Sequence, residues 1–233
     1  MPAAAVPPFQ TIVFDLDGTL IDSALDVGLA VSRVLNDEGL PALDDATVRS
    51  LMGEGGKMML KRAFARAERP LDEATLGSLT RRFIGYYKED PVTHTVPYPG
   101  VIETLDELRR QGVRLAICTN KFEDPARQVL DRLDLMRFFD DVAGADTFDV
   151  RKPDGGHITQ LVARMRSEIR HTAMVGDSIH DVNAARHAGI PVVAVTSGYT
   201  VQEPATFGAD RLIDRFPDLL PALDDIARQR ARP

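Results

Sequence analysis

The fold of this chain is constrained most strongly by two short apolar runs that end in acidic residues, TIVFDLDGT at 11–19 and AMVGDSIHD at 173–181. Apolar residues in such short runs predict a buried strand in each. Glycine then interrupts each run, so the carboxylates lie where the strand leaves the core. Ligands bind at the carboxyl ends of the strands in an open α/β sheet. We therefore expect both runs to deliver carboxylates to one site.

These carboxylates, Asp15, Asp17, Asp177 and Asp181, would repel one another without a cation. Two like charges 4 Å apart repel by roughly 4 kcal/mol at an effective dielectric constant near 20. Oxygen ligands favour a hard ion such as Mg²⁺. The acidic runs therefore predict a magnesium-dependent enzyme.

Composition excludes several other classes of protein. The net charge of −7 argues against a nucleic-acid partner bound through a basic surface. No apolar run approaches the roughly 18 residues that a membrane span needs. Residues 1–8 lack the basic and apolar regions of a signal peptide. The single cysteine, Cys118, excludes an internal disulfide and lies in an apolar run, where we expect a buried thiol. We therefore expect a cytoplasmic protein without a nucleic-acid or membrane partner; its oligomeric state is not indicated.

The second half of the chain has the pattern of a parallel sheet. Strand-like runs alternate with amphipathic helical segments closed by Gly112 and Gly189. This alternation predicts an α/β fold, a doubly wound parallel sheet with helices on both faces. The expected strands after the first are 113–118, 173–176 and 191–195, and the expected helices are 100–111, 124–133 and 179–188.

The segment between the first strand and this alternating region contains no convincing strand. Ser23 is expected to cap a helix that runs to Glu38, and Asp44 or Asp45 to cap another, before helices at 57–67 and 72–87. We therefore predict a helical cap domain at 21–96, inserted after the first strand of an α/β core formed by 9–20 and 97–233. The glycine-rich segment 53–57 lacks the spacing of a phosphate loop, but it could still reach the site.

Four motifs, in order along the chain, resemble the haloacid dehalogenase superfamily, whose usual members are phosphatases. The run Asp15–Leu20 resembles the first motif, and Thr119, at the end of an expected strand, resembles the second. Lys152–Pro153 resembles the third motif, and Gly176–Ser178 with Asp181 resembles the fourth. The resemblance covers residues 11–214 and implies a Rossmann-like core with a helical cap.

The resemblance implies a phosphomonoester hydrolase that forms an aspartyl-phosphate intermediate. Asp15 would be the nucleophile, and Asp17 the general acid and then the general base. Mg²⁺ would be bound by Asp15, Asp177 and the main-chain carbonyl of Asp17. Thr119 and Lys152 would hold the phosphoryl oxygens.

Several neighbouring residues would assist this chemistry. Asn120 and Lys121 would bind substrate or phosphate beside the second motif. Asp181, Gly18 and Ser178 would support the metal site, with Asp181 orienting the metal shell or a water molecule.

Within the superfamily, the runs 98–100, 119–121 and 197–199 resemble phosphoglycolate phosphatases. Phe122 and residues 154–156 depart from that group, which commonly has proline after the lysine and a second proline after the third motif. The resemblance implies 2-phosphoglycolate as the substrate.

Other functions share parts of this pattern. A β-phosphoglucomutase-like or pyrophosphatase-like member would have the same core, and a phosphoacceptor signalling module also places aspartates, a lysine and Mg²⁺ at strand ends. A carboxylate on the substrate would need a cation besides Lys152, and Lys121 and Lys57 are the candidates.

Overall fold

The structure is a computed structural model that describes residues 8–200 and 202–231. The expectation about a signal peptide concerns residues 1–8 and falls almost wholly outside the described residues. Of the helices in the described ranges, none is both long enough and apolar enough to cross a membrane.

A six-stranded parallel sheet forms the centre of the molecule, in the order β5-β4-β1-β6-β7-β8. The strands are β1 (Thr11–Phe14), β4 (Arg114–Cys118), β5 (Asp141–Ala143), β6 (Thr172–Gly176), β7 (Val192–Val195) and β8 (Arg211–Ile213). The expected α/β fold is confirmed. Because β1 lies between β4 and β6, the two acidic runs follow adjacent strands.

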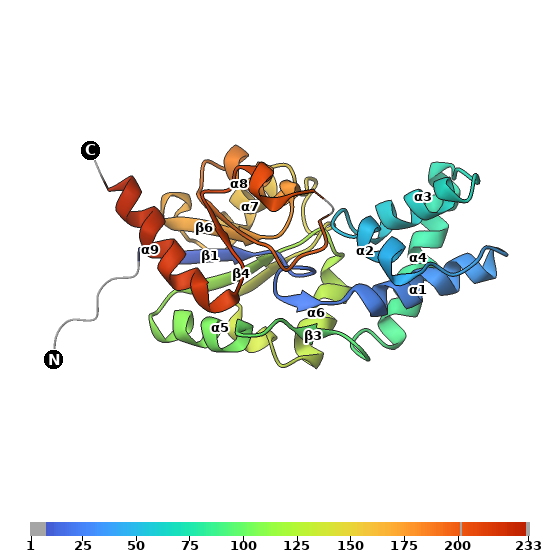
Figure 1. Cartoon of the computed structure of the whole chain (residues 1–233), viewed down its shortest axis with the longest axis horizontal. Helices are drawn as coiled ribbons and strands as arrows, with labels where there is room; N and C mark the ends of the chain where they lie inside the picture. Colours follow the sequence, from blue (N-terminus) through green and yellow to red (C-terminus); the bar gives the residue numbers. More distant parts are fainter. Residues whose placement is uncertain (1–7, 201, 232–233) are drawn as a thin grey trace.

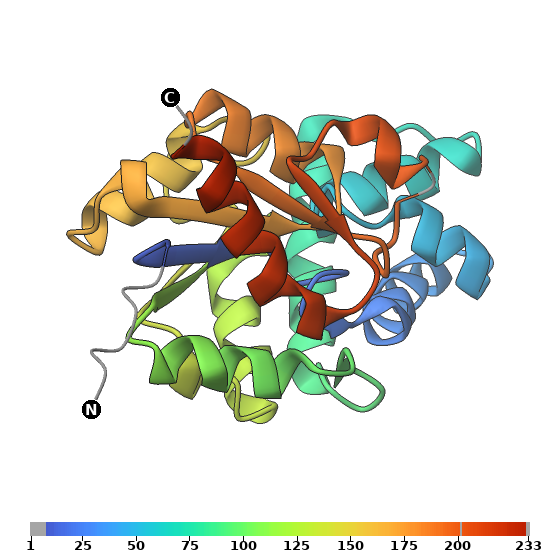
Figure 2. The same ribbon diagram turned by 60° about the vertical axis from the view of Figure 1, so that its left-hand side comes forward.

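Helices cover both faces of this sheet because successive strand residues point to opposite sides. Val13 of β1 packs in one core with residues of α7 and α8, whereas Ile12 and Phe14 pack in the other with residues of α5, α6 and α9. Figure 2 shows the sheet between these layers, with α9 (red) across one face. The helices are α5 (Val101–Arg110), α6 (Glu123–Arg132), α7 (Gly156–Arg164), α8 (Ile179–His187) and α9 (Leu219–Arg230). Short 3₁₀ helices lie at Met136–Phe138, Ile169–His171, Pro204–Phe207 and Phe216–Asp218.

Four further helices gather at the carboxyl end of the strands (Figure 1). They are α1 (Ala24–Asp37), α2 (Asp45–Leu51), α3 (Gly56–Arg66) and α4 (Glu73–Glu89), and we call them the helical group. Their apolar faces pack on one another through side chains such as Val31, Leu35, Leu60, Phe64 and Leu79.

The expectation of no strand between 21 and 96 is wrong at both ends of that segment. The strands β2 (Ile21–Asp22) and β3 (Val96–Pro97) pair antiparallel where the chain enters and leaves the helical group. Two residues are too few to show the alternating pattern of a strand, and the partners are far apart in sequence. The pairing brings the two connections to the helical group side by side.

The helix caps follow the sequence with one exception. Asp44 and Asp72 each accept a hydrogen bond from a main-chain N–H at 2.7 Å and begin α2 and α4. Ser23 precedes α1 as expected, but within the described chain its side chain makes no capping hydrogen bond. The Ser23 hydroxyl has a different partner, Asp17, described below.

Candidate active site

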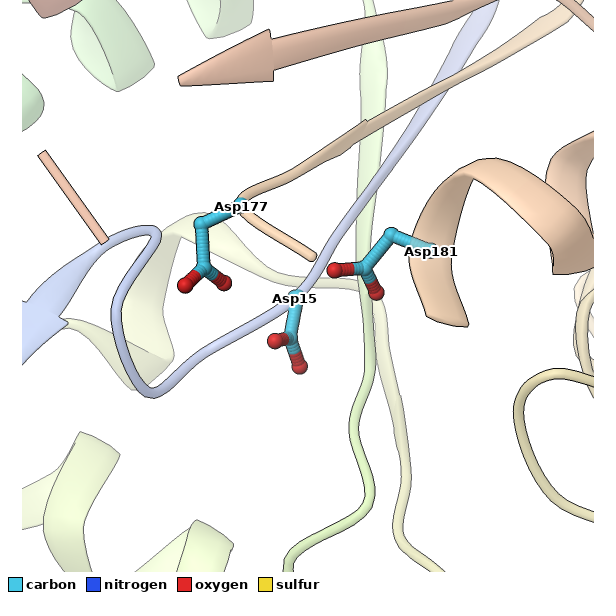
Figure 3. A group of neighbouring side chains, drawn as sticks. All are labelled: Asp15, Asp177 and Asp181. Atoms are coloured by element: carbon cyan, nitrogen blue, oxygen red, sulfur yellow. The ribbon is translucent and has the colours of Figure 1, made fainter. Parts of the chain in front are cut away.

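Carboxylates from the two acidic runs meet at the carboxyl end of the sheet (Figure 3). Asp15 follows β1, Asp177 follows β6, and Asp181 lies in the first turn of α8. All three are buried, and each offers an oxygen within 4.8 Å of those of the other two. Adjacent parallel strands explain this convergence, because Asp15 N donates to Val175 O across the β1–β6 pair at 2.9 Å.

Lys152 is the cation paired with this acidic cluster. Its Nζ lies 2.8 Å from Asp15 Oδ1 and 2.5 Å from Asp181 Oδ1. Burial lowers the pKa of Lys152, but the charges of Asp15 and Asp181 more than offset this, so its pKa lies above the ordinary value. The lysine therefore stays charged.

The cluster is nevertheless short of positive charge. Burial raises the pKa of Asp15 from 3.8 to about 6, although Lys152 partly opposes this. Burial and then the charges of Asp15 and Asp181 raise the pKa of Asp177 well above its ordinary value. Three buried carboxylates thus share one ammonium group, which is the situation a divalent cation relieves.

The contacts of the oxygen atoms show which carboxylates could bind that cation. Asp15 Oδ1 is buried beside the Lys152 ammonium group at 2.8 Å, but this ion pair lacks the geometry of a hydrogen bond, and no other group within the described chain donates to the atom. Asp181, in contrast, has both oxygens engaged, one by Lys152 and the other by the main-chain N–H and hydroxyl of Ser178, at 3.0 and 2.7 Å. Asp177 accepts single bonds, from Thr19 Oγ1 and the Tyr199 N–H, both at 3.1 Å. Oxygen donors of this kind suit a hard divalent metal, with Asp15 and Asp177 as the available ligands.

Gly18 allows the chain to turn closely past Asp177. Its φ is +89°, and a Cβ placed there would lie 2.5 Å from Asp177 Oδ2. Any larger residue would be strained and would collide with the carboxylate.

The Asp17 carboxylate is not part of the three-aspartate cluster found among the described residues, contrary to the expectation that all four gather. The turn at Gly18 directs Asp17 toward Lys121, whose Nζ lies 3.0 Å from each of its carboxylate oxygens. The Ser23 hydroxyl donates to Asp17 Oδ1 at 2.5 Å. Asp17 is therefore held beside the cluster by the ammonium group of Lys121 and the hydroxyl group of Ser23.

Lys121 is itself enclosed by the helical group. Its Nζ lies 4.4 Å from the centroid of the Tyr87 ring of α4, within the range of a cation–π contact. Burial lowers the pKa of Lys121, but the charge of Asp17 and the contact with Tyr87 outweigh burial and raise it. Lys121 is therefore a permanent positive charge at the boundary between the sheet and the helical group.

Thr119 and Asn120 follow β4, at the same end of the sheet. The Thr119 N–H donates to Ala143 O at 2.9 Å, which fixes the loop, and Asn120 Nδ2 donates to Gly53 O at 3.4 Å. Asn120 Oδ1 is buried without a hydrogen-bond partner in residues 8–200 and 202–231. A Cβ on Gly55 would lie 2.4 Å from Asn120 O. The glycine-rich loop of the helical group thus reaches this site.

A cavity of about 40 Å³ lies between the sheet edge and the helical group. One wall is formed by Asp15, Asp17, Thr119, Asn120 and Lys121, and the other includes Val27, Leu51, Met59, Phe83, Ile84 and Tyr87. Lys121 is the one basic side chain among the described residues that line it. A water molecule needs about 10–15 Å³ of such space, so this arrangement has room for only a few waters.

Two other sequence candidates lie away from this chemistry. The Lys57 ammonium pairs with Glu73 at 3.0 Å on the exposed side of the helical group, and Lys57 is not among the described residues that line the cavity. Cys118 is buried as expected, and burial raises the pKa of its thiol to about 12.

Three contacts of the site were not predicted from the sequence. The sequence pattern places Tyr87 only in a helix, predicts Ser23 only as a cap, and includes Tyr199 only in a motif. A serine six residues after Asp17 has no recognisable pattern, because its role depends on the fold of the intervening turn.

Comparison with known proteins identifies the family. The family model of haloacid dehalogenase-like hydrolases matches residues 12–195. The chain is 42% identical to a phosphoglycolate phosphatase of Agrobacterium fabrum, over 91% of each chain. It is 41% identical to one of Caulobacter vibrioides, over 90% of this chain and 88% of that protein.

Solved structures give the same result. The crystal structure of a predicted phosphoglycolate phosphatase from Haemophilus somnus has a TM-score of 0.85 and 31% identity, and the match covers 93% of this chain and 99% of that one. The expected family is thus confirmed: the chain belongs to the haloacid dehalogenase-like hydrolases and is a phosphatase of that family.

Proposed function

We propose that this enzyme hydrolyses small phosphate monoesters through an aspartyl phosphate on Asp15, with Mg²⁺ as its metal ion and 2-phosphoglycolate as its preferred substrate. The observation that carries this proposal is the charge balance of the site. Three buried carboxylates face a single lysine, and a second, largely enclosed lysine, Lys121, lines the cavity.

Asp15 and Asp177 would hold Mg²⁺ through side-chain oxygens, with the main-chain carbonyl of Asp17 as a third ligand. When bound, the ion would supply positive charge that offsets the carboxylates and the phosphoryl group. Asp181 would act indirectly, because its oxygens already hold Lys152 and Ser178. It would keep Lys152 directed at Asp15.

In the first step, a carboxylate oxygen of Asp15 would attack phosphorus. The new bond joins Asp15 to the phosphoryl group, and the bond from phosphorus to the ester oxygen breaks. Asp17 would donate its proton to that leaving oxygen. Thr119, Asn120 and Lys152 would hold the phosphoryl oxygens as charge develops on them.

In the second step, Asp17 would act in the opposite sense. It would take a proton from a water molecule while the water oxygen attacks phosphorus. The bond to Asp15 breaks, inorganic phosphate leaves, and both carboxylates return to their starting states. The buried Asn120 Oδ1, which lacks a partner within the described chain, is available to accept a hydrogen bond from phosphate or water at this stage.

We further propose that residues 21–96 form a cap domain over a core of residues 9–20 and 97–233. The paired strands β2 and β3 form the connection between them. The small cavity volume supports this division, because movement of the helical group away from the sheet edge would widen the cavity for a substrate. Closure would then exclude bulk water from the phosphoryl group.

The substrate proposal rests on Lys121 and on the names of the relatives. A carboxylate next to the phosphate ester, as in 2-phosphoglycolate, would give the Lys121 ammonium a second partner besides Asp17. A neutral sugar would not, and the helical side of the cavity is largely apolar. Relatives 36–42% identical are named phosphoglycolate phosphatases.

A panel of phosphate esters, assayed with Mg²⁺ and after chelation, tests the proposal. We expect the highest kcat/KM for 2-phosphoglycolate and loss of activity on chelation. Full activity after exhaustive chelation would exclude the metal. A tenfold or greater preference for a sugar phosphate or for pyrophosphate would overturn 2-phosphoglycolate as the substrate, but the proposed phosphatase chemistry would stand. A stable phosphoprotein without turnover would indicate a signalling module instead.

A further inference from the structure

Tyr199 lies between the metal-binding edge of the sheet and the turn that carries Asp17. It follows β7 and is buried, with 6% of its surface exposed. Its main-chain N–H donates to Asp177 Oδ2 at 3.1 Å. A Cβ on Gly18 would lie 3.0 Å from Tyr199 Cδ2, so the ring packs directly against the turn after Asp17.

The hydroxyl group of Tyr199 holds the far end of that turn. It accepts a hydrogen bond from the Ser23 N–H at 2.6 Å and donates one to Asp22 Oδ1 at 2.9 Å. The side chain of Ser23 in turn donates to Asp17 Oδ1 at 2.5 Å. One tyrosine thus connects Asp177 with the residue that orients Asp17.

Arg49 extends this connection to the helical group. Its Nη2 lies 3.1 Å from Asp22 Oδ2, and its guanidinium lies 5.7 Å from the centroid of the Tyr199 ring. Asp22 is in β2, where the chain enters the helical group, and Arg49 is in α2. The carboxylate that accepts the Tyr199 hydroxyl therefore also binds the helical group.

We infer that Tyr199 is a positioning residue for the phosphatase reaction, and that Arg49 makes its action depend on the placement of α2. Tyr199 holds the turn of Asp17 against Asp177, so that the proton donor keeps its place relative to the metal ligands. Asp22 accepts the Tyr199 hydroxyl and also pairs with Arg49. A movement of the helical group would therefore shift Asp22 and change its hydrogen bond with Tyr199. This inference rests on the roles proposed above for Asp17 and Asp177.

The chain offers matched variants for a test. Tyr199→Phe removes the hydroxyl but keeps the ring and the N–H to Asp177. Arg49→Gln removes the ion pair to Asp22 at a half-exposed side chain. Arg82→Gln is the control, because Arg82 pairs with Glu38 inside the helical group, away from the strands β2 and β3.

The first measurement is kcat/KM for two substrates, an alkyl phosphate and 4-nitrophenyl phosphate. The 4-nitrophenolate leaving group departs without a proton, whereas the alkoxide of the alkyl ester needs a proton donor. Tyr199→Phe should lower kcat/KM for the alkyl ester about tenfold, the loss expected for about one hydrogen bond. The loss for 4-nitrophenyl phosphate should be at least about threefold smaller, because a displaced acid matters most for a poor leaving group. A general loss of folding would not select between the two esters.

The second measurement is hydrogen exchange at the Ser23 amide, which does not depend on activity. Exchange should be faster in Tyr199→Phe, and also in Arg49→Gln, than in wild type and Arg82→Gln. If Tyr199 and Arg49 act through Asp22, the double variant should lose less kcat/KM than the product of the single losses.

Several results would overturn the inference. If hydrogen exchange at the Ser23 amide were unchanged in Tyr199→Phe, the hydrogen bond from Ser23 N–H to the Tyr199 hydroxyl would not hold the turn. Equal losses with both esters would reduce Tyr199 to a structural residue. If the loss of kcat/KM in the double variant equalled the product of the single losses, Arg49 would not act through Tyr199. Asp17→Asn, measured with the same two esters, distinguishes a failure of this inference from a failure of the proposed function. Equal losses of kcat/KM with both esters in Asp17→Asn would overturn the proton-donor role of Asp17, and the inference about Tyr199 would fall with that role.

Discussion

On the sheet side of the cavity, Asp15 is held by an ion pair with the buried Lys152, and Asp17 and Lys121 form an ion pair with each other. On the opposite side, the helical group contributes apolar side chains such as Met59 and Phe83, together with the glycine-rich loop. The first wall is fixed by adjacent parallel strands, whereas the second packs chiefly on itself and touches the sheet side at a few points. The difference suggests that the sheet edge determines the chemistry and the helical wall determines access.

The few contacts across the cavity explain how the two walls could cooperate. Tyr87 covers Lys121, Gly53 accepts a hydrogen bond from Asn120, and Arg49 pairs with Asp22. The first two connect the helical group to the loop after β4, and the third connects α2 to β2. Substitutions on the sheet side should therefore change rate constants, and those at the crossing contacts should change selectivity.

The largest effect is expected at Asp15. Asp15→Asn keeps the size of the side chain but removes the charged attacking oxygen, so kcat should fall by about 1000-fold or more. Circular dichroism should show an intact fold, because the substitution removes a charge from an already crowded acidic cluster. Retention of even about a tenth of the wild-type kcat by clean protein would contradict the assignment.

A smaller and substrate-dependent effect is expected at Asp17. Asp17→Asn should lower kcat/KM about 100-fold for an alkyl phosphate, in the range of general acid catalysis. The loss should be much smaller for 4-nitrophenyl phosphate, whose leaving group departs without a proton. The ratio kcat/KM reports only steps up to the first phosphoryl transfer, so slow hydrolysis of the aspartyl phosphate does not obscure it. Equal losses would count against the proton-donor role.

The two walls also differ in how well the sequence predicts them. Asp15 and Asp177 could be placed together from the sequence, because each follows an apolar run and parallel strands end at one edge of a sheet. The helices of the helical group were predicted to within a few residues from their caps and periodicity. The strands β5 and β8, with three residues each, were too short to recognise.

What the sequence could not predict are contacts between segments far apart in the chain. The cation–π contact of Lys121 with Tyr87 depends on how α4 packs over the loop after β4. The bond from Ser23 to Asp17 depends on the turn at Gly18, and it replaced the expected capping bond. Periodicity identifies which face of an element is buried, but not which polar atom it meets there.

At the boundary between the walls, Lys121 and Lys57 can be compared directly. Lys121→Ala should reduce the preference for 2-phosphoglycolate over ethyl phosphate, which lacks the carboxylate, by about tenfold, as expected for loss of one charge-assisted hydrogen bond. Lys57→Ala should leave this ratio unchanged, because Lys57 pairs with Glu73 outside the cavity. Both esters are measured as kcat/KM, so the shared loss of the Asp17 contact cancels in the ratio. A shift caused by Lys57→Ala alone would reverse the assignment of the two lysines.

The smallest effect concerns stability, and its sign follows from the raised pKa values of the cluster. Because the folded-state pKa of Asp15, about 6, lies above its ordinary 3.8, protonation favours the folded state. Its contribution to stability is fully present below pH 3.8 and is lost as the pH rises through about 6. The pKa of Asp177 is raised well above its ordinary value, so its contribution has the same sign. In the chelated protein, the cluster should therefore be most destabilising above neutral pH.

Asp177→Asn isolates this effect. After chelation at pH 8, the variant should unfold about 2–4 °C above wild type, the shift that 1 kcal/mol produces in a chain of this size. Mg²⁺ should raise the midpoint of wild type but leave that of the variant unchanged. Asp44→Ala has the opposite pH dependence. The main-chain N–H of Thr47 lowers the pKa of Asp44, so the stability that this helix cap contributes is lost as the pH falls. Thermal denaturation from pH 4 to 8, with and without Mg²⁺, measures all three proteins. If chelated Asp177→Asn were less stable than chelated wild type at pH 8, the Asp177 carboxylate would stabilise the fold. Asp177 would then be a structural residue, and the assignment of the sheet edge to chemistry would not hold at this position.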